Sequence, residues 1–256
     1  MKDVKDLPLA IIIPVRKEEE TIIDTLELIK KSVHTKYVVL VVDDMITSSD
    51  KTIDRVKRYQ KKNRNIRILK KLIHHASGFS FAVWRGIQEA HQGAIVIVMA
   101  DGCDDLNIID RMFEKIFSGY DIVCGSRYMK GGKKIGGPKI QGFFSFIVNI
   151  SLSFLLRLPT KDVSNAFKMY RRDIFNTMPR PTSTGFEISM EIFFNAYFRG
   201  AKITETPTTW IGRSKGESKF KLIERAPGYV RIYLWILANA IRQLFHMSVI
   251  PLSGNV

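Results

Sequence analysis

The sequence predicts an α/β protein built on a doubly wound, mostly parallel sheet with helices on both faces. Short apolar strands, such as LAIIIPV at 9–15, alternate in the first half with segments that repeat apolar residues at helical spacing. Strands that are buried on both faces read as continuous apolar runs, which is typical of a parallel sheet covered by helices. The length of 256 residues suits one domain with an appendage. We expect a main domain over 1–222 and a C-terminal helix and tail over 223–256.

The elements of the first half follow one another in a regular order. Strands are expected at 9–15, 37–44, 66–69, 94–101 and 121–127. Helices are expected between them at 18–31, 49–59, 79–91 and 106–117. Ligands of such sheets bind at the carboxyl ends of the strands, where the strand order reverses.

Acidic residues gather at two of these strand ends. Asp43 and Asp44 end the second strand, and Asp101, Asp104 and Asp105 follow the fourth. Clustered carboxylates are costly unless a cation or donor groups neutralise them, and carboxylate oxygens suit Mg²⁺ or Mn²⁺. The alternative is that each aspartate caps the helix that follows it. The joint pattern favours a metal or ligand site.

The second half predicts a basic loop and an apolar helix. The segment 129–139 combines lysines with glycines, which let the backbone approach a phosphate, although a solvated linker has the same composition. A helix at 143–158 places Ser145, Asn149 and Ser153 on a narrow polar stripe and is otherwise apolar. We expect it to be buried nearly all round.

A second amphipathic helix is expected at 229–247. A basic and aromatic face holds Arg231, Trp235, Asn239, Arg242 and His246, and the remaining positions are mostly apolar. Packing against the domain is one explanation. We favour the other, in which both helices lie in a membrane interface.

The composition restricts the class of protein. The net charge is 40 − 25 = +15, so the surface attracts anions. Nucleic acid is not expected as a partner, because the basic segment 51–71 holds Tyr59 as its sole aromatic residue and no zinc or RNA-binding motif occurs. An anionic membrane leaflet fits the charge better. The cysteines, Cys103 and Cys124, are too few for a disulfide scaffold or a four-cysteine zinc site and indicate a reducing cytosol.

The location expected from these features is peripheral, on the cytoplasmic side of a membrane. No uninterrupted apolar stretch reaches the roughly 18 residues that a spanning helix requires. The run Leu9–Ile13 leads into charged residues without a small-residue cleavage site, so a secretory signal is not expected.

An ordered set of motifs resembles one family. The first half contains IIIPVRKEEETI, VVLVVDDMITSSDKT, HHASGFSFAVWRGIQEA, VIVMADGCDD and DIVCGSRYMKGG. The second half adds DVSNAFKMYRRDIF, GFEISMEIFFNAYFRGAKITETP and RSKGESK. From about Leu9 to Lys219 this set resembles the inverting family 2 glycosyltransferases of the GT-A fold, which use nucleotide-diphosphate sugars. Within them it is most similar to the polyprenyl-phosphate (dolichyl-phosphate) mannosyl- and glucosyltransferases.

The resemblance implies roles for particular residues. The residues that would contact the nucleotide sugar are Pro14, Arg16, Glu18, Asp43 or Asp44, Gly78 and Asp101. Asp101, with Asp104 or Asp105, would hold Mg²⁺ or Mn²⁺ against the donor diphosphate. A basic loop with Arg213, Ser218 and Lys219 would close over the diphosphate. Metal and cationic side chains suit this reaction, because the departing nucleotide diphosphate accumulates negative charge.

The acceptor implied by the resemblance is a polyprenyl phosphate at the membrane surface. A phosphate monoester is largely ionised near pH 7, because its second pKa is about 6, and needs no strong base. A saccharide or other hydroxyl acceptor would need one, for which Asp162 is the first candidate and Glu187 the second. Transfer to a hydroxyl acceptor and an inactive, partner-binding scaffold are the alternatives. A second copy of the chain or a membrane subunit is a further possible partner.

Overall fold

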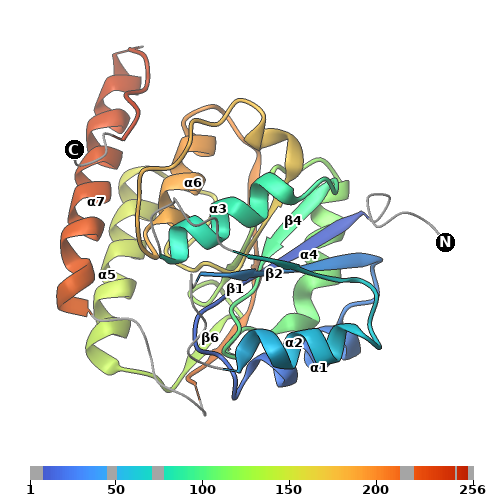
Figure 1. The fold of residues 1–256 in the computed structure, drawn as a ribbon. Coiled ribbons are helices and arrows are strands. Elements are labelled where there is room, and N and C mark those ends of the chain that lie inside the picture. Colours follow the sequence, from blue (N-terminus) through green and yellow to red (C-terminus); the bar gives the residue numbers. More distant parts are fainter. Residues whose placement is uncertain (1–7, 45–50, 71–77, 214–221, 246, 253–256) are drawn as a thin grey trace.

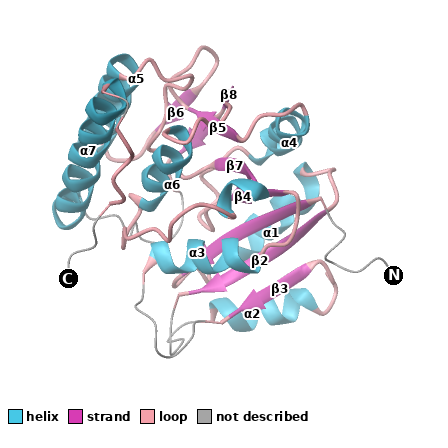
Figure 2. Ribbon diagram, turned by 90° about the horizontal axis from the view of Figure 1, so that it is seen from above, coloured by secondary structure: helices cyan, strands magenta, loops and turns pink. Residues whose placement is uncertain are grey.

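The computed structural model describes residues 8–44, 51–70, 78–213, 222–245 and 247–252. It confirms the predicted α/β class, with a seven-stranded sheet in the order β3-β2-β1-β4-β7-β5-β8 (Figures 1 and 2). The strands of this sheet are β1 (Leu9–Val15), β2 (Tyr37–Asp43), β3 (Ile66–Leu69), β4 (Ala94–Ile97), β5 (Ile122–Ser126), β7 (Lys168–Arg171) and β8 (Ile203–Pro207). β7 runs antiparallel to β4 and β5, and the other pairs are parallel.

Helices cover both faces of the sheet, as predicted. They are α1 (Ile22–Ser32), α2 (Thr52–Gln60), α3 (Phe79–Glu89), α4 (Ile109–Phe117), α5 (Lys139–Leu155), α6 (Ile188–Tyr197) and α7 (Leu222–Leu244). Two single-turn 3₁₀ segments are η2 (Leu106–Ile108) and η3 (Arg172–Phe175). Along β1, Ile11 and Ile13 pack with α1, α2 and α4, whereas Ile12 packs in the second core layer with α3, α6 and α7. This alternation explains why each central strand is apolar at every position.

The strand order reverses between β1 and β4. The chain builds β2 and β3 outward from β1 and then returns to place β4 on the other side of β1. Ile12 pairs with Ile97, and Val98 donates its N–H to the carbonyl of Ile12 at 3.0 Å. The strand expected at 94–101 therefore ends at Ile97, and its last residues form a loop beside the end of β1. Such a reversal is the preferred place for a ligand in an open α/β sheet.

The helix at 143–158 is not buried nearly all round by the rest of the protein, and its expected position in a membrane interface stays a prediction. The helix observed there, α5, has Asn149 and Leu152 as its buried residues, whereas Phe143 and Phe154 are 62% and 82% exposed. Asn149, from the expected polar stripe, points inward because the neighbouring loop presents peptide groups that need hydrogen-bond partners. The polar stripe is thus the inner face of the helix and the apolar positions face outward.

The C-terminal helix is not simply inverted, because Ile232 and Ile236 of its expected apolar positions are fully buried together with part of the expected polar face. In α7, Trp235 and Asn239 of the expected polar face are buried, and the Trp235 ring packs against Phe198 at 5.8 Å. Leu234 and Leu244 are 60% and 78% exposed. α5 and α7 lie side by side at one end of the molecule in both views (Figures 1 and 2). No helix in the described part of the chain is long and apolar enough to cross a membrane.

Candidate active site

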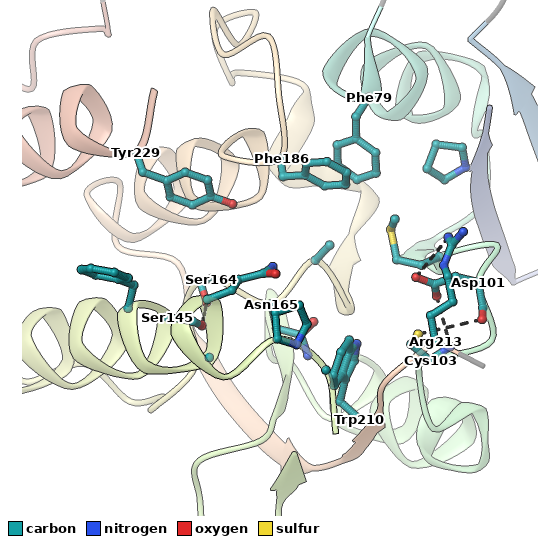
Figure 3. Close-up of a pocket in the computed structure, with 18 of the residues that line it drawn as sticks. Phe79, Asp101, Cys103, Ser145, Ser164, Asn165, Phe186, Trp210, Arg213 and Tyr229 are labelled. Carbon is teal, nitrogen blue, oxygen red and sulfur yellow. Dashed lines mark hydrogen bonds and ion pairs between the residues drawn. The ribbon is translucent and has the colours of Figure 1, made fainter. Parts of the chain in front are cut away.

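A cavity of about 1340 Å³ opens at the reversal point of the sheet and extends to the gap between α5 and α7. Asp101, Cys103 and Arg213 lie at one end, and Ser145 and Tyr229 lie at the other (Figure 3). The first end is lined by charged groups. The second is lined mainly by aromatic and aliphatic side chains, which are Phe144, Val148, Tyr229, Val230, Tyr233 and Leu234.

The turn after β1 holds a buried carboxylate beside the cavity. Lys17 has a left-handed backbone (φ 55°), which folds the chain back so that Glu18 lies under the cavity rim at 8% exposure. The Thr21 hydroxyl donates to the Glu18 carboxylate at 3.1 Å, and the Glu18 N–H donates to the Thr52 hydroxyl at 2.9 Å. The carboxylate is therefore fixed by the starts of α1 and α2.

Arg213 joins the turn after β1 to the acidic loop after β4. Its Nη2 lies 3.1 Å from Oε1 of Glu18 and 3.5 Å from Oδ2 of Asp101. The short strand β9 (Thr209–Ile211), paired with β6 (Lys133–Ile135), brings Arg213 there, because Ile211 donates its N–H to the carbonyl of Cys103 at 3.0 Å. Burial opposes the charge of Arg213, but the two carboxylates raise its pKa above the ordinary value.

The three aspartates that were expected around a metal have different environments. Asp101 lines the cavity and accepts the Cys103 N–H at 3.1 Å. Asp104 is turned inward, where it accepts the Met99 N–H at 3.2 Å, and burial together with the charge of Asp101 raises the pKa of Asp104 to about 7. Asp105 caps η2 by accepting from the backbone and side chain of Asn107. Asp101 is thus the member of this trio that faces the cavity.

The donor set fits Mg²⁺ or Mn²⁺ if the substrate completes the coordination. Among the described residues, no group of three or more histidine, cysteine, aspartate or glutamate side chains is placed to enclose a metal ion. Mg²⁺ is commonly held by one or two carboxylates, with water and substrate phosphates supplying the other oxygens. The Asp101 carboxylate, 16% exposed and on the cavity wall, fits this mode.

The end of β2 provides a second acidic contact. Asp44 lines the cavity and accepts the Gly78 N–H at 2.6 Å, which fixes the start of α3, and Arg16 lies 3.9 Å away. Gly78 has φ 140°, and a Cβ there would lie 2.8 Å from the carbonyl oxygen of Thr184. Pro14 also lines the cavity, whereas Asp43 does not. The structure therefore brings Pro14, Arg16, Glu18, Asp44, Asp101 and Arg213 around one end of the cavity.

Arg127 is a second arginine that lines the cavity, in addition to Arg213. Its side chain donates to both oxygens of Asp162, from Nε at 2.7 Å and from Nη2 at 2.9 Å. The backbone N–H of Arg127 donates to Asp162 as well. Its Nη2 also lies 3.2 Å from Oγ of Ser164 and 3.5 Å from Oγ of Ser145. Burial opposes the charge of Arg127, but Asp162 raises its pKa.

Neither candidate base reaches the cavity wall. Asp162 is fully buried and engaged by Arg127. Glu187 is 4% exposed, accepts the Gly185 N–H at 3.0 Å and packs against Gly228 of α7. Ser218 and Lys219 lie outside the described residues.

Several lining residues were not singled out from the sequence as site residues. Arg127, Ser164 and Asn165 line the cavity together with Trp210, whose ring lies 5.1 Å from the Lys134 ammonium. A signal existed for Ser164 and Asn165, because both belong to the motif DVSNAFKMYRRDIF, and for the neighbouring Ser145, which belongs to the polar stripe of the helix predicted at 143–158. For Arg127 the signal was its position directly after a strand, the location already used to select the aspartates.

A family model for glycosyl transferase family 2 matches residues 10–178. The match covers the sheet from β1 to β7 and includes the acidic loop and Arg127. The chain belongs to this family, has the GT-A fold and is a nucleotide-sugar-dependent glycosyltransferase.

Two relatives are similar over most of this chain. A dolichol-phosphate mannosyltransferase of Pyrococcus furiosus is 28% identical over 256 residues, which cover 97% of this chain and 69% of the relative. An undecaprenyl-phosphate mannosyltransferase of Micrococcus luteus is 27% identical over 230 residues, which cover 89% and 93%. Among solved structures, glucosyl-3-phosphoglycerate synthase of Mycobacterium tuberculosis with Mn²⁺ and UDP-glucose is similar in fold, with a TM-score of 0.66 and 14% identity over 92% of this chain and 79% of that one.

Proposed function

We propose that this protein transfers a hexose from a nucleotide-diphosphate sugar to a polyprenyl phosphate at a membrane surface, with inversion at the anomeric carbon. The observation that carries the proposal is the single cavity, which connects Asp101 and Arg213 through Arg127 to an apolar gap between α5 and α7. A sugar transfer to a lipid phosphate needs these three environments in this order. The named activities of the two mannosyltransferase relatives support the lipid phosphate as acceptor.

The donor binds at the acidic end of the cavity. Pro14, Arg16 and Asp44 contact the nucleoside, and Gly78 keeps the start of α3 close to it. Asp101 holds Mg²⁺ or Mn²⁺, which when bound neutralises the charge that develops on the departing nucleotide diphosphate. Arg213 exchanges its carboxylate partners for the diphosphate oxygens. Ser218 and Lys219, from the same segment of the sequence, also bind the diphosphate.

The acceptor phosphate binds beside Arg127. An ionised phosphate oxygen attacks the anomeric carbon from the face opposite the diphosphate, and the bond to the diphosphate oxygen breaks with its electron pair. This attack needs no proton transfer, because the phosphate is already ionised near pH 7. The engagement of Asp162 by Arg127 agrees with this chemistry, since Asp162 positions a cation rather than accepting a proton. A hydroxyl acceptor would need a general base, and among the described residues around Arg127 no exposed carboxylate could accept its proton.

The lipid chain leaves the cavity between α5 and α7. Side chains exposed on the two helices form an apolar surface that consists of Phe143, Phe146, Ile147, Phe154, Leu155, Val230, Leu234, Ile241 and Leu244. We call this the α5–α7 surface. Contact between this surface and the acyl region of a bilayer explains why large apolar side chains point away from the protein core.

Two measurements test the proposal. In a thermal-shift panel of UDP, GDP, CDP, ADP and dTDP with and without Mn²⁺, one base should stabilise the protein in a metal-dependent manner, by about 2.7 kcal/mol at ~100 times its dissociation constant. The corresponding labelled nucleotide sugar should then donate its hexose to a polyprenyl phosphate.

Asp101→Asn should remove the metal-dependent shift and lower kcat by about a hundredfold or more, because a metal contact to the leaving group is lost. Asp54→Asn, at an exposed aspartate of α2, is the matched control and should leave both unchanged. Full activity of Asp101→Asn would remove the metal assignment. Transfer to a saccharide but not to polyprenyl phosphate would favour the hydroxyl-acceptor alternative.

A further inference from the structure

A buried lysine lies directly behind the loop that carries Ser164. Lys168, in β7, has no exposed surface, and burial lowers the pKa of its ammonium group to about 8. None of the ion pairs between described residues includes it. A buried cation without a carboxylate partner is costly, and an apolar side chain of similar length would avoid this cost. The position of Lys168 therefore calls for an explanation other than packing.

The ammonium group of Lys168 holds the loop by its carbonyl groups. Nζ donates to the carbonyl of Val163 at 2.9 Å, to the carbonyl of Asn165 and to Oγ of Ser189 at 2.7 Å. The Ser189 hydroxyl in turn donates to the carbonyl of Asn165 at 2.9 Å. The two carbonyls on either side of Ser164 are thus directed to one cation in the core.

The amide groups of the same loop are held from the opposite side by α5. Oδ1 of Asn149 accepts the N–H of Val163 at 2.6 Å and that of Ser164 at 3.0 Å. Lys168 and Asn149 together bind two carbonyl groups and two N–H groups of the loop at residues 163–165. The Ser164 side chain is therefore directed toward the cavity, where its Oγ lies 3.2 Å from Nη2 of Arg127 and 3.0 Å from Oγ of Ser145.

The charges around this loop do not balance. Arg127 and Lys168 lie close enough for the charge of one to oppose that of the other, and Asp162 is the carboxylate that acts on both, while Asp104 acts on Arg127 as well. Lys134, on the cavity wall, is also affected by Arg127. The described cations of this cluster therefore outnumber its carboxylates, an arrangement that favours an anion in the cavity at this place.

We propose that Lys168 is a positioning residue for the acceptor phosphate: by clamping the carbonyls of Val163 and Asn165 against the core, it sets Ser164 beside Arg127. This inference rests on the proposed function, because it takes the anion at Arg127 to be the phosphate of the acceptor. Lys168 does not touch the substrate. It acts through the loop at residues 163–165.

The kinetic test compares Lys168→Met with Lys168→Arg. Lys168→Met should raise the KM for polyprenyl phosphate by about ten- to a hundredfold, the effect of losing charged hydrogen bonds, and leave the KM for the nucleotide sugar within about twofold. Lys168→Arg keeps the charge and should recover part of the acceptor affinity. Arg172→Met is the matched control, because Arg172 also donates to a backbone carbonyl, that of Ala90, away from the cavity. An unchanged acceptor KM in Lys168→Met, or an equal rise for donor and acceptor, would overturn the inference.

A second measurement does not depend on turnover. Ser189→Ala removes one contact of Lys168 with little change in volume, and amide hydrogen exchange reports on the loop directly. The amides of Val163 and Ser164 should exchange faster in Ser189→Ala and in Lys168→Met than in the wild type, whereas amides of β1 should not change. Unchanged exchange in both variants would contradict the clamp. If the wild type transfers no sugar to polyprenyl phosphate, the proposed function fails, and this experiment still decides whether Lys168 holds the loop.

Discussion

At the scale of single residues, Arg213 is the cation for which we propose a role at the leaving group. It bridges Glu18 and Asp101 at distances of 3.1 and 3.5 Å. A guanidinium group between two carboxylates reduces their mutual repulsion while no donor is bound. The same group can donate to diphosphate oxygens once the donor enters, so one side chain serves both states of the site.

Arg213→Gln should therefore impair catalysis more than folding. We expect kcat/KM for the nucleotide sugar to fall by about a hundred- to a thousandfold, because a cation at the leaving group is removed. Steady-state kinetics with both substrates would measure this loss. Arg85→Gln, at a surface ion pair of α3, is the control and should retain wild-type kinetics. Equal kinetics in the two variants would exclude a role for Arg213 at the diphosphate.

Lys168 gives the stability of the protein a defined pH dependence. Its pKa is about 8 in the folded state and 10.5 as an ordinary lysine. Below about pH 8 the folded and unfolded states both bind the proton, and between the two pKa values the unfolded state binds more protons. The free energy of unfolding should therefore rise with pH over this interval, by about 3 kcal/mol in total from this residue.

Urea unfolding from about pH 7 to about pH 10 would measure this rise. Lys168→Met is the reference, because it lacks the titrating group, and the free-energy difference between the two proteins should change over the interval. A difference that stays constant with pH would show that Lys168 has an ordinary pKa.

The acidic loop shows how far single residues could be predicted from the sequence. The sequence did not show which of Asp101, Asp104 and Asp105 faces the ligand. It did predict that all three follow a strand. Their directions depend on hydrogen bonds within the folded loop, to the Met99 N–H for Asp104 and to the Asn107 N–H for Asp105. Arg127 was missed because its partner, Asp162, is distant in the sequence and the ion pair forms only in the folded chain.

At the scale of elements, α5 is the place where the periodic pattern predicted a helix but not its orientation. The ratio of apolar to polar positions indicated burial nearly all round, and the polar stripe was the minor feature. In the structure, Asn149 satisfies the loop at residues 163–165, which requires the stripe to face inward. The orientation of the helix therefore depends on peptide groups of another segment that need hydrogen-bond partners. No pattern within the helix sequence can show this.

The orientation of α5 and α7 predicts which side chains make the membrane contact that we propose. Phe154→Asp and Leu244→Asp place a charge on the α5–α7 surface at side chains that are 82% and 78% exposed. Each variant should weaken binding to lipid vesicles by about tenfold or more, since burial of a large apolar side chain contributes roughly 1.5–3 kcal/mol. The melting temperature should hardly change, because neither side chain is part of the core.

Sedimentation with vesicles would measure this binding. Phe117→Asp is the matched control, because Phe117 is 85% exposed but lies at the end of α4, away from α5 and α7 (Figure 1). If Phe117→Asp weakened vesicle binding as much as the other two variants, the α5–α7 surface would not be the membrane contact.

At the scale of the whole molecule, the mostly parallel sheet could be predicted from the sequence, whereas its strand order and the position of the antiparallel strand could not. Continuous apolar strands alternating with helices predicted the mostly parallel sheet, which the structure confirms. They also predicted a ligand site at the strand ends, where the structure has the cavity, and this site stays a prediction. β7 follows the loop at residues 162–165 and runs back between β4 and β5. We attribute its direction to the position of that loop beside the cavity. The four residues of the strand itself cannot indicate this position.

The positions of the basic residues behind the net charge of +15 predict which side of the molecule would meet an anionic membrane. Lys139 and Arg157 are exposed at the two ends of α5 and therefore flank the α5–α7 surface. The basic residues Lys61 and Lys62 follow α2 and lie away from that surface (Figure 1). Each cation near an anionic leaflet contributes about 1 kcal/mol, and this attraction falls off over a Debye length of about 8–10 Å. Charges beside α5 should thus contribute and those beyond α2 should not.

Vesicles that contain anionic lipid should therefore bind the protein more tightly than neutral vesicles at low ionic strength. High salt should reduce the difference, leaving the apolar contribution of the α5–α7 surface. Substitution of both Lys139 and Arg157 by Gln should weaken binding to anionic vesicles by about tenfold or more, whereas Lys61→Gln with Lys62→Gln, which removes the same charge, should have little effect. The reverse result would place the basic side of the molecule at α2 against the membrane. The open end of the cavity would then lie away from the bilayer, which would contradict a lipid acceptor.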